Sequence, residues 1–539
     1  MQYLSFTLKG LWLFLFLIAI QISAQVTRQP YLQMLTPTSI EVRWNTDSSG
    51  TGKVHYGLST EALSSTVVES ASRTFHQVGL SGLSPDTKYY YSIDTLAGSE
   101  EQYFTTSPNV GDKGQKKRIW VISDFGQSRI SDNTARKFTM LRWKNFNNDS
   151  YHSDLVLSLG DQTENDTQDE LQKTYFDLLE GVLLNSPLFT IQGNHDNYDG
   201  FVNYRKTFTL PANGESGGYP SNNQDYYSFD FGNIHVVGLS TEIDDIDGTQ
   251  LTWLKNDLQN IDQEKTDWLI ACLHRPFHSG GYHPTDASGT AQKQRTYWLK
   301  ELEDYGVDVI LQGHNAIYER SYLIDNLIGK TTDLTVENII DDGNGREDGD
   351  GAYYKGSGLS PHHGTIFIEV APGGNSVKNN ANYPIFAYAF SGSSIEGSVV
   401  IDVDGASRMD VHFLCNTPDA DVNYVWDYFT IIKTDSISTG TRTLKDVSDN
   451  HNIRNYPNPF RQSTQISYDL GRADFVRVDI YDMMGRAVYS SDVGLKEKGM
   501  HTIEWSARDE NGDKLPEGMY IAQIQGSRIV RKTRMMLLQ

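Results

Sequence analysis

Five apolar segments in the middle of the chain each end on a short polar cluster, and this spacing limits the fold more than any other feature. The segments, such as residues 118–123, 154–159 and 308–312, are rich in Val, Ile and Leu, which is typical of buried strands. Parallel strands present functional residues where the chain leaves the core. The clusters are, in chain order, Asp124-Phe125-Gly126, Gly160-Asp161, Gly193-Asn194-His195-Asp196, Cys272-Leu273-His274 and Gly313-His314. The pattern predicts a site assembled from five loops.

The residue types in these clusters are those that bind metal ions. Asp124 and Asp161 would repel each other if brought together without a cation. Carboxylates, the amide oxygen of Asn194 and the imidazoles of His274 and His314 together suit a divalent or trivalent ion. Each motif alone is weak, because Asp-x-Gly and Gly-Asn are common turns and a histidine at a strand end is usually hydrogen-bonded. Five such polar clusters in succession, each after a predicted strand, predict a metal centre.

The clusters resemble the motifs of the calcineurin-like metallophosphoesterases and, within them, of the purple acid phosphatases. That pattern is Asp-x-Gly, Gly-Asp-x-x-Tyr, Gly-Asn-His-Asp/Glu, a strand-end His and Gly-His-x-His-x-Tyr-Glu-Arg. The resemblance covers residues 25–435 and departs from the pattern at two positions, where Glu164 replaces the tyrosine and Ala316 replaces the second histidine of the last motif. It implies a secreted enzyme that hydrolyses phosphate esters by attack of metal-activated water.

The resemblance implies two metal positions, and two divalent ions are therefore expected as cofactors. The ligands of one position would be Asp161, Asn194, His274 and His314, which suit zinc, iron or manganese. The other would share Asp161 and add Asp124, with Glu164 offering a carboxylate in place of the tyrosine. Because Ala316 cannot coordinate a metal, this second position is expected to be oxygen-only and to suit magnesium, manganese or calcium. Without a tyrosinate ligand the protein should not be purple.

Two histidines match the catalytic positions of the same family. His195 stands where an imidazole contacts the phosphate and protonates the leaving oxygen, and His283 stands where a second histidine faces the substrate. A histidine with a near-neutral pKa suits such general acid work. For His278 and His283 the alternative, a loop histidine in solvent, has equal weight. Arg320 is expected to form a structural ion pair rather than to bind phosphate.

Length and charge limit the remaining possibilities. A chain of 539 residues is too long for one core and predicts several domains. Its formal net charge of -23 excludes nucleic acid as an expected partner, because phosphates need a basic surface. Attraction for a phosphate ester substrate must then come from the local charge of the metal ions. The two cysteines, Cys272 and Cys415, are expected to be free, since Cys272 lies within a buried strand.

The amino-terminal part predicts an exported protein with a small β domain. Residues 1–24 have the pattern of a signal peptide, whose apolar stretch is shorter than the roughly 20 residues that span a bilayer, so no transmembrane segment is expected in the mature chain. Alternation in residues 39–44 and 88–93 predicts a β-sandwich over residues 25–110. This segment is similar to the fibronectin type III-like domain that precedes the catalytic domain in purple acid phosphatases, and packing is its expected role.

Residues 456–539 predict a second small β domain after a linker at residues 436–455. Alternation in residues 476–480 favours a β-sandwich. Motifs such as Tyr456-Pro457-Asn458-Pro459-Phe460 resemble the carboxy-terminal sorting domain of the type IX secretion system of Bacteroidetes-type bacteria. The resemblance implies the type IX secretion machinery as a partner, and a secreted or outer-membrane surface location. An adhesive module is the alternative.

The expected architecture is multidomain, with an α/β metallophosphoesterase sandwich at residues 117–435 flanked by two all-β sandwiches. A Gly- and Asp-rich stretch at residues 341–351 is expected to be a solvated loop, because its spacing does not fit a calcium-binding loop. Two functional alternatives stay open. One is a degenerate phosphatase that binds one metal and phosphate with little turnover, and the other is a surface adhesion protein.

Overall fold

The computed structural model describes residues 24–93, 98–126, 133–370, 383, 385–389, 396–416, 424–435, 453–470, 474–482, 486–509, 512–525 and 530–538. The chain divides into two compact units, residues 1–437 and 438–539. Most of the expected signal peptide, residues 1–23, and most of the expected linker, residues 436–452, lie outside the described residues.

Five strands at the start of the first unit form one connected sheet in the order β1-β2-β4-β5, with β3 paired to β2. They are β1 (Val26–Gln33), β2 (Ser39–Gly57), β3 (Ser65–Ser81), β4 (Lys88–Ser92) and β5 (Tyr103–Thr105). With 19 residues, β2 is long enough to pair with β1 near its start, with β3 along most of its length and with β4 at its end. Residues 25–110 therefore form a β domain, while their division into the two layers of a sandwich stays a prediction.

This β domain packs directly against the domain that follows it in the chain. The ring of Tyr31 lies 4.8 Å from that of Phe176, and its hydroxyl donates a 2.7 Å hydrogen bond to the carbonyl of Thr207. The guanidinium of Arg28 lies 4.0 Å from the centre of the Phe176 ring. Buried residues of the two parts belong to one continuous hydrophobic core. The packing role expected of this domain agrees with these contacts.

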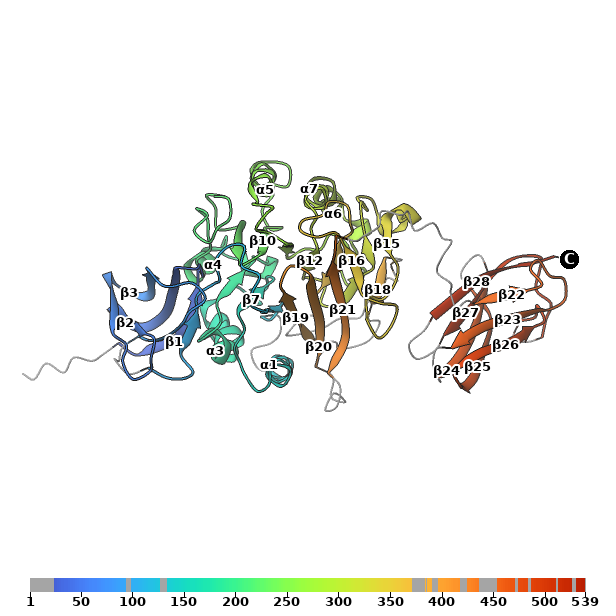
Figure 1. Ribbon diagram of the computed structural model, residues 1–539, viewed down its shortest axis with the longest axis horizontal. Helices are drawn as coiled ribbons and strands as arrows, with labels where there is room; N and C mark the ends of the chain where they lie inside the picture. Colours follow the sequence, from blue (N-terminus) through green and yellow to red (C-terminus); the bar gives the residue numbers. More distant parts are fainter. Residues whose placement is uncertain are drawn as a thin grey trace, which may run out of the picture. The chain divides into compact units, whose positions relative to one another are not determined.

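Two seven-stranded sheets form the centre of the first unit (Figure 1). The first has the order β16-β21-β20-β19-β6-β7-β8, and the second has the order β18-β13-β17-β12-β11-β10-β9. The first sheet contains β6 (Lys117–Ile122), β7 (Leu155–Ser158), β8 (Leu188–Thr190), β16 (Tyr353–Lys355), β19 (Gly397–Asp404), β20 (Arg408–Cys415) and β21 (Val425–Lys433). The second contains β9 (Tyr227–Phe231), β10 (Ile234–Leu239), β11 (Trp268–Leu273), β12 (Val309–Gln312), β13 (Glu319–Ser321), β17 (Ile366–Glu369) and β18 (Phe386–Ala389).

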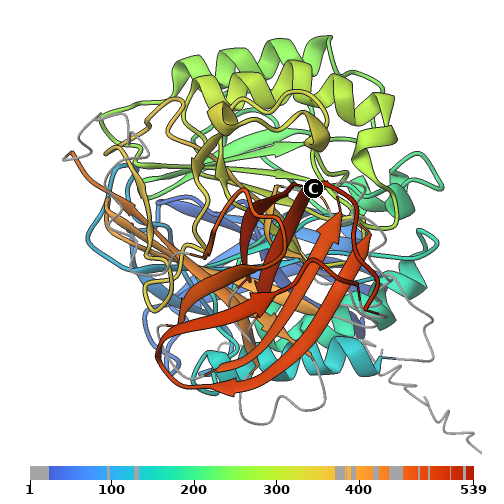
Figure 2. The same ribbon diagram turned by 90° about the vertical axis from the view of Figure 1, so that its right-hand side faces the viewer.

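Helices cover the outer face of the second sheet. Apolar side chains of α5 and α7, including Leu254 and Leu302, share a core with Val237 of β10 and Ile310 of β12. Figure 2 shows the green and yellow-green helices of this layer running side by side above the strands. They are α5 (Thr249–Asn260), and the continuous run of α6 (Gly289–Gln294), η4 (Arg295–Leu299) and α7 (Lys300–Asp304).

A second set of helices lies against the first sheet. The indole of Trp143 on α1 stacks on that of Trp120 on β6, with ring centroids 5.1 Å apart. These helices are α1 (Thr134–Phe146), and the run of α2 (Gln168–Glu170), η1 (Leu171–Phe176) and α3 (Asp177–Leu183). Short elements in the loops are η2 (Asn194–Asp196), α4 (Val202–Thr207), η3 (Thr285–Ala287), β14 (Leu323–Ile324), η5 (Thr331–Asp333), η6 (Val336–Asn338) and β15 (Ile339–Asp341).

The five apolar segments singled out by the sequence are strands β6, β7, β8, β11 and β12. The first three pair in parallel, as do β10, β11, β12 and β17. Their carboxyl ends therefore lie at one edge of each sheet, and the polar clusters continue from those ends. Both cysteines are buried and free, which confirms that expectation.

The second unit consists of two sheets around one core. One has the order β22-β23-β26 and the other has the order β25-β24-β27-β28. Ile466, Val478, Trp505 and Ala522 are among the buried residues that the two sheets share. The strands are β22 (Arg454–Tyr456), β23 (Thr464–Leu470), β24 (Asp474–Asp482), β25 (Ala487–Lys496), β26 (Gly499–Trp505), β27 (Gly518–Gln525) and β28 (Val530–Leu537). This is the two-layer arrangement that the alternating pattern predicts.

Candidate metal centre

The ends of three strands bring together a group of metal-ligand atoms. Asp161 follows β7, His274 follows β11 and His314 follows β12, and one potential ligand atom from each lies within 4.8 Å of the others. Nε2 of His274 is 3.3 Å from Oδ2 of Asp161 and 3.2 Å from Oδ1 of Asn194. The four side chains expected at one metal position therefore converge.

The backbone around these side chains is unusual in conformation and tightly packed. Asp124, Asp161, His314 and Ala316 all have positive φ, at 48°, 53°, 77° and 52°. A residue other than glycine in this region costs on the order of 1–3 kcal/mol, and such strain gathers at functional sites. A Cβ added to Gly193 would lie 2.1 Å from Oδ1 of Asp161, so only glycine fits there. The close approach of Gly193 thus restricts the side chain of Asp161.

Hydrogen bonds orient His274 as they do in known metal sites. Its Nδ1 donates to the carbonyl of Leu159 at 2.7 Å, which leaves Nε2 directed at Asp161 and Asn194. Metal-ligating histidines usually have their second ring N–H held in this way by a carbonyl or carboxylate. The side chain is fully buried, so the ring has no freedom to turn away.

Two further atoms of the site are buried without a hydrogen-bond partner. Oδ2 of Asp124 accepts from Oγ of Ser123 at 2.5 Å and from the amide of His314 at 3.0 Å. Its Oδ1 has no partner, and neither has Nδ1 of His314. An orphaned buried polar atom costs about 1–3 kcal/mol, and a bound cation would remove that cost for both atoms. These donor atoms therefore fit the divalent ions expected for the fold.

The charges of the site are strongly coupled. Burial raises the pKa of the Asp124 carboxyl to about 6, with the neighbouring Asp161 charge adding to the effect and His274 opposing it. Burial works against ionisation of Asp161, but the charge and hydrogen bond of His274 hold its pKa below the usual range. The same burial opposes protonation of His274, yet the Asp161 and Asp124 charges raise its pKa to about 10. The charges of Asp161 and His274 therefore stabilise each other.

Arg275 makes a contact that restricts His314. Its Nη1 lies 3.0 Å from Nε2 of His314, and the same guanidinium pairs with Glu242 at 2.8 Å. Because a guanidinium can only donate, Nε2 must accept, and the neutral ring then has its proton on Nδ1. A ring that binds a metal through Nδ1 needs that proton on Nε2 instead. The Arg275 contact would therefore compete with any coordination of a metal ion by Nδ1 of His314. Sequence reasoning missed Arg275, whose only signal was its position next to His274.

Glu164 and His195 lie together beside the cluster. Nδ1 of His195 donates to the carbonyl of Glu164 at 2.8 Å, and the amide of His195 donates to Oδ1 of Asp161 at 2.9 Å. Oε1 of Glu164 lies 4.0 Å from Nδ1 of His195, and its side chain is 42% exposed. Within the described part of the chain, the close group of ligand atoms does not include Glu164. Its expected role as a metal ligand stays a prediction.

The two histidines of the loop after β11 have different surroundings. The ring of His283 stacks on that of His314, with centroids 4.8 Å apart and planes 18° apart, and its side chain is exposed at the edge of the site. His278 is fully buried, and its Nε2 donates to the carbonyl of Leu327 at 3.1 Å. Burial lowers the pKa of His278 to about 3. The interpretation of His278 as a histidine in solvent is therefore wrong, since it is a neutral core residue.

Arg320 forms the structural ion pair expected of it. Its Nε lies 2.6 Å and its Nη2 3.0 Å from the two carboxylate oxygens of Asp427, and the hydroxyl of Tyr318 donates to the same carboxylate at 2.9 Å. Arg320 and Asp427 are both fully buried. Its guanidinium is thus committed to a carboxylate in the core.

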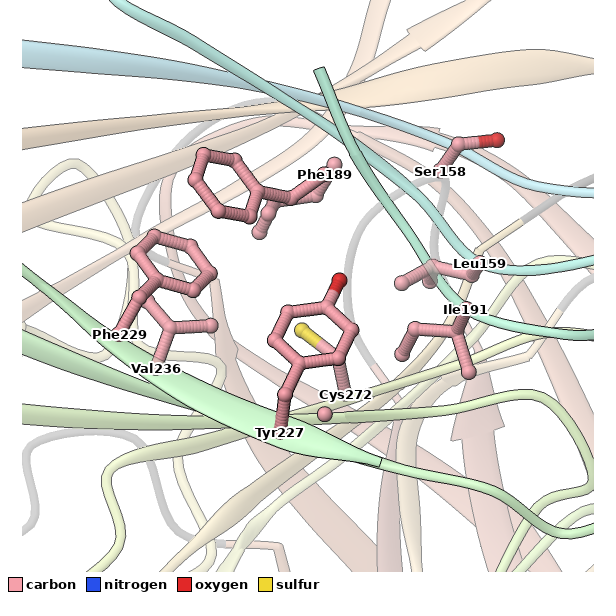
Figure 3. Close-up of a pocket in the computed structure, with 10 residues that line it drawn as sticks. Ser158, Leu159, Phe189, Ile191, Tyr227, Phe229, Val236 and Cys272 are labelled. Atoms are coloured by element: carbon pink, nitrogen blue, oxygen red, sulfur yellow. The ribbon is translucent and has the colours of Figure 1, made fainter. Parts of the chain in front are cut away.

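A small cavity lies between the two central sheets and is lined by residues of both. Figure 3 shows the side chains of Phe189, Ile191, Tyr227, Val236 and Cys272 around it. The hydroxyl of Tyr227 is already bonded to the carbonyl of Thr190 at 2.7 Å. An apolar lining of this kind cannot bind a phosphate group, because a buried anion needs partners. The cavity therefore belongs to the core.

Three segments of the chain match known protein families. Residues 117–318 match the calcineurin-like phosphoesterase family, and residues 27–106 match the N-terminal domain of purple acid phosphatases. Residues 458–528 match the FlgD Ig-like domain. The first unit thus carries a calcineurin-like metallophosphoesterase domain. The order of these two matches is similar to that of the purple acid phosphatases.

Relatives over this region are plant and animal acid phosphatases. Purple acid phosphatase 23 of Arabidopsis thaliana is 28% identical over 367 residues, which are 57% of this chain and 76% of the relative. Purple acid phosphatase 15 of the same plant is 31% identical over 288 residues, 47% of this chain and 50% of the relative. Acid phosphatase type 7 of Homo sapiens is 28% identical over 269 residues, 47% of this chain and 58% of the relative. The chain thus spans between half and about three quarters of these proteins.

Solved structures with this fold agree with the family matches. The purple acid phosphatase PPD1 from yellow lupin seeds has a TM-score of 0.58 and 18% identity, covering 75% of this chain and 74% of its own. PhoD has a TM-score of 0.50 and 12% identity, covering 72% of this chain and 87% of its own. At these identities the likeness concerns the fold alone. The metallophosphoesterase fold expected from the sequence is confirmed, whereas fibronectin type III and type IX sorting identities stay predictions.

Proposed function

We propose that the protein hydrolyses phosphate esters by in-line attack of metal-activated water. The observation that supports this most is the convergence of Asp161, Asn194, His274 and His314 at the strand ends. Asp124 adds an orphaned carboxylate oxygen next to them. A carboxylate, an amide oxygen and two imidazoles form a donor set suited to zinc, iron or manganese.

Two divalent ions held by these residues would clamp a phosphoryl group and lower the pKa of a coordinated water from 15.7 to roughly 7. Asp161 is the proposed shared ligand, because its Oδ2 lies 3.3 Å from Nε2 of His274 and its charge acts on Asp124. The side chains of Asn194 and His314 complete the nitrogen-containing position. The acidic surface of the protein offers no general attraction for anions, so the ions must provide it.

His195 is the proposed general acid for the leaving oxygen. Its Nδ1 is fixed by the carbonyl of Glu164, so Nε2 is the ring atom that can serve a substrate. The hydrogen bond from the backbone amide of His195 to Asp161 holds this residue close to the ligand cluster. His283 is the proposed second contact, because it stacks on His314 from the exposed side. A phosphate held by the metal ions would then have two imidazoles within the same site.

Metal content and hydrolysis of an aryl phosphate, each measured with and without a chelator, test this function. Two ions per chain with chelator-sensitive turnover support the proposal. One ion without turnover would favour the degenerate phosphatase, for which Ala316 is the reason, and no bound ion would favour an adhesion protein. Turnover that survives complete removal of metal would contradict the proposed mechanism.

We also infer that the protein is exported and reaches the cell surface or the medium through the type IX secretion machinery. This rests on the sorting-domain motifs within residues 456–539. None of the helices in the described part of the chain is long and apolar enough to cross a membrane. Deleting residues 456–539 in a bacterium that has this pathway should retain the protein in the periplasm. Unchanged delivery to the surface would contradict the inference.

A further inference from the structure

The two most exposed aromatic side chains in the described part of the first unit lie at the candidate metal centre. Tyr198 is 67% exposed and Tyr282 is 62% exposed, whereas the next aromatic side chain in this order, Tyr354 on β16, is 54% exposed. Tyr198 follows η2 in the loop after β8, and Tyr282 belongs to the loop after β11. Single exposed aromatic residues are common on protein surfaces. Two of them, from separate loops beside one site, favour a role in binding.

Each tyrosine ring contacts one of the two histidines that are proposed to act on the substrate. The ring centroid of Tyr198 lies 6.0 Å from that of His195, with an angle of 63° between the planes. The ring centroid of Tyr282 lies 4.7 Å from that of His283, with an angle of 79°. His283 stacks in turn on His314. Both tyrosines therefore adjoin the proposed substrate-side histidines, and most of each side chain stays exposed.

Hydrogen bonds hold the residue that follows each tyrosine. The buried side chain of Asn315 accepts from the amide of His283 at 2.8 Å and donates to the carbonyl of His283 at 3.1 Å. The amide of Asp199 donates to Oδ2 of Asp166 at 3.0 Å. A tyrosine side chain has only two torsion angles and loses little entropy when a ligand orders it. The backbone therefore presents both rings at the site before a ligand binds.

The charge of the chain favours a leaving group without further negative charge. A formal net charge of -23 opposes the approach of an ester that carries additional phosphates or carboxylates. Affinity for the leaving group then depends on uncharged contacts. Exposed aromatic rings provide such contacts, because two rings attract each other in offset-stacked or edge-to-face arrangements with centroids about 4.5–7 Å apart.

We propose that Tyr198 and Tyr282 bind an aromatic ring of the leaving group, so that the substrates are phosphate esters of phenols. The ring of an aryl ester is bonded directly to the leaving oxygen. His195 is the proposed acid for that oxygen, and Tyr198 is the exposed ring beside His195. A nucleotide fits this arrangement less well, because a sugar separates its base from the ester oxygen. The inference rests on the proposed phosphoesterase function and specifies the substrate class of the same site.

Steady-state kinetics of the Mn²⁺-loaded full chain on phenyl phosphate, adenosine 5′-monophosphate and glycerol 2-phosphate tests the proposal. Tyr198→Ala and Tyr282→Ala should each lower kcat/KM for phenyl phosphate about three- to tenfold, mainly through a higher KM. The values for glycerol 2-phosphate, which has no ring, should stay at the wild-type level. Each variant is compared with wild type on the same ester, so differences in leaving-group reactivity between the esters cancel.

Two kinds of control separate ring contact from general effects. Tyr198→Phe and Tyr282→Phe keep the ring and should keep the wild-type kcat/KM for phenyl phosphate. Tyr354→Ala removes an exposed ring from β16, which lies at the opposite end of the first sheet from β8, and should change none of the values. Equal losses on all three esters, a loss confined to adenosine 5′-monophosphate, or no loss on phenyl phosphate would overturn the proposal.

Binding of two phosphonates that cannot be hydrolysed provides a readout independent of turnover. In calorimetric titrations, wild type should bind phenylphosphonate about tenfold more tightly than methylphosphonate. The double variant Tyr198→Ala/Tyr282→Ala should lose most of this preference and keep its affinity for methylphosphonate. A wild-type protein without the preference, or a double variant that retains it, would overturn the role of the two rings.

The outcomes separate this inference from the proposed function. A preference for phenylphosphonate that depends on the tyrosines, without hydrolysis of any ester, would overturn the proposed function and leave the ring contacts intact. Chelator-sensitive hydrolysis that neither tyrosine affects would overturn the ring contacts and leave the function intact. Neither hydrolysis nor a preference for phenylphosphonate would contradict both.

Discussion

At the scale of single residues, we expect Arg275 to limit how readily His314 can bind a metal ion. The hydrogen bond that Arg275 donates to Nε2 of His314 keeps the ring proton on Nδ1. Coordination of a metal ion through Nδ1 needs a free lone pair on that atom instead. Replacing Arg275 with Gln provides an amide oxygen that can accept from Nε2–H, as the partners of ligating histidines usually do. We predict that Arg275→Gln binds Zn²⁺ about tenfold more tightly than wild type in calorimetric titrations.

Arg205→Gln is the control for this variant. Arg205 also pairs with a carboxylate, Asp225, at 2.7 Å, but it lies on α4 and has no contact with His314. Its replacement should leave the Zn²⁺ affinity unchanged. An Arg275→Gln protein with equal or weaker affinity would show that His314 does not coordinate through Nδ1.

At the scale of elements, a buried histidine links β9, β10 and α5. Nδ1 of His235 lies 2.7 Å from Asp230, and Nε2 lies 3.0 Å from Asp257. Burial alone would lower the pKa of His235, but the charges and hydrogen bonds of Asp257 and Asp230 raise it to about 10. The unfolded chain has a histidine pKa of about 6.5. The ion pairs of His235 therefore contribute their full stabilisation below about pH 6.5. This stabilisation is lost as the pH rises through about 10, the pKa of His235 in the folded protein.

We predict that the free energy of unfolding falls by on the order of a few kcal/mol between pH 7 and pH 10. Urea unfolding of chelator-treated protein at several pH values measures this change in the free energy of unfolding. His235→Gln should be less stable at pH 7 and should lose less stability over the same range. Parallel pH profiles for the two proteins would contradict a charged His235.

The sequence predicts the strands of this fold better than it predicts the site. Apolar runs that end on Asp124, Asp161 and His274 identify buried strands, because their composition is local and strong. Arg275 escapes such reasoning, because no motif marks it and its contact with His314 arises only where the ends of β11 and β12 lie side by side. The same limit applies to Glu164, where the motif gave the position but not the direction of the side chain.

At the scale of the whole first unit, the N-terminal β domain is part of the catalytic domain's core. Tyr31 is 1% exposed, packs on Phe176 and bonds to the carbonyl of Thr207. We predict that Tyr31→Ala lowers the free energy of unfolding by about 3–5 kcal/mol, as for other large-to-small core changes. Urea unfolding followed by tryptophan fluorescence should show the catalytic domain unfolding at a lower urea concentration.

Tyr456→Ala is a suitable comparison, because Tyr456 is 81% exposed and belongs to the second unit. It should leave the first unit's transition unchanged. If Tyr31→Ala unfolded the β domain alone and the catalytic domain kept its wild-type midpoint, the shared core would not couple the two.

The central claim is that strand-end residues of two sheets hold two ions that share Asp161. A crystal structure of the Mn²⁺-loaded protein, with anomalous scattering data, tests it most directly. We predict two anomalous peaks about 3.5–4 Å apart, one beside Asn194, His274 and His314 and the other beside Asp124. A single peak, or peaks away from Asp161, would contradict the account.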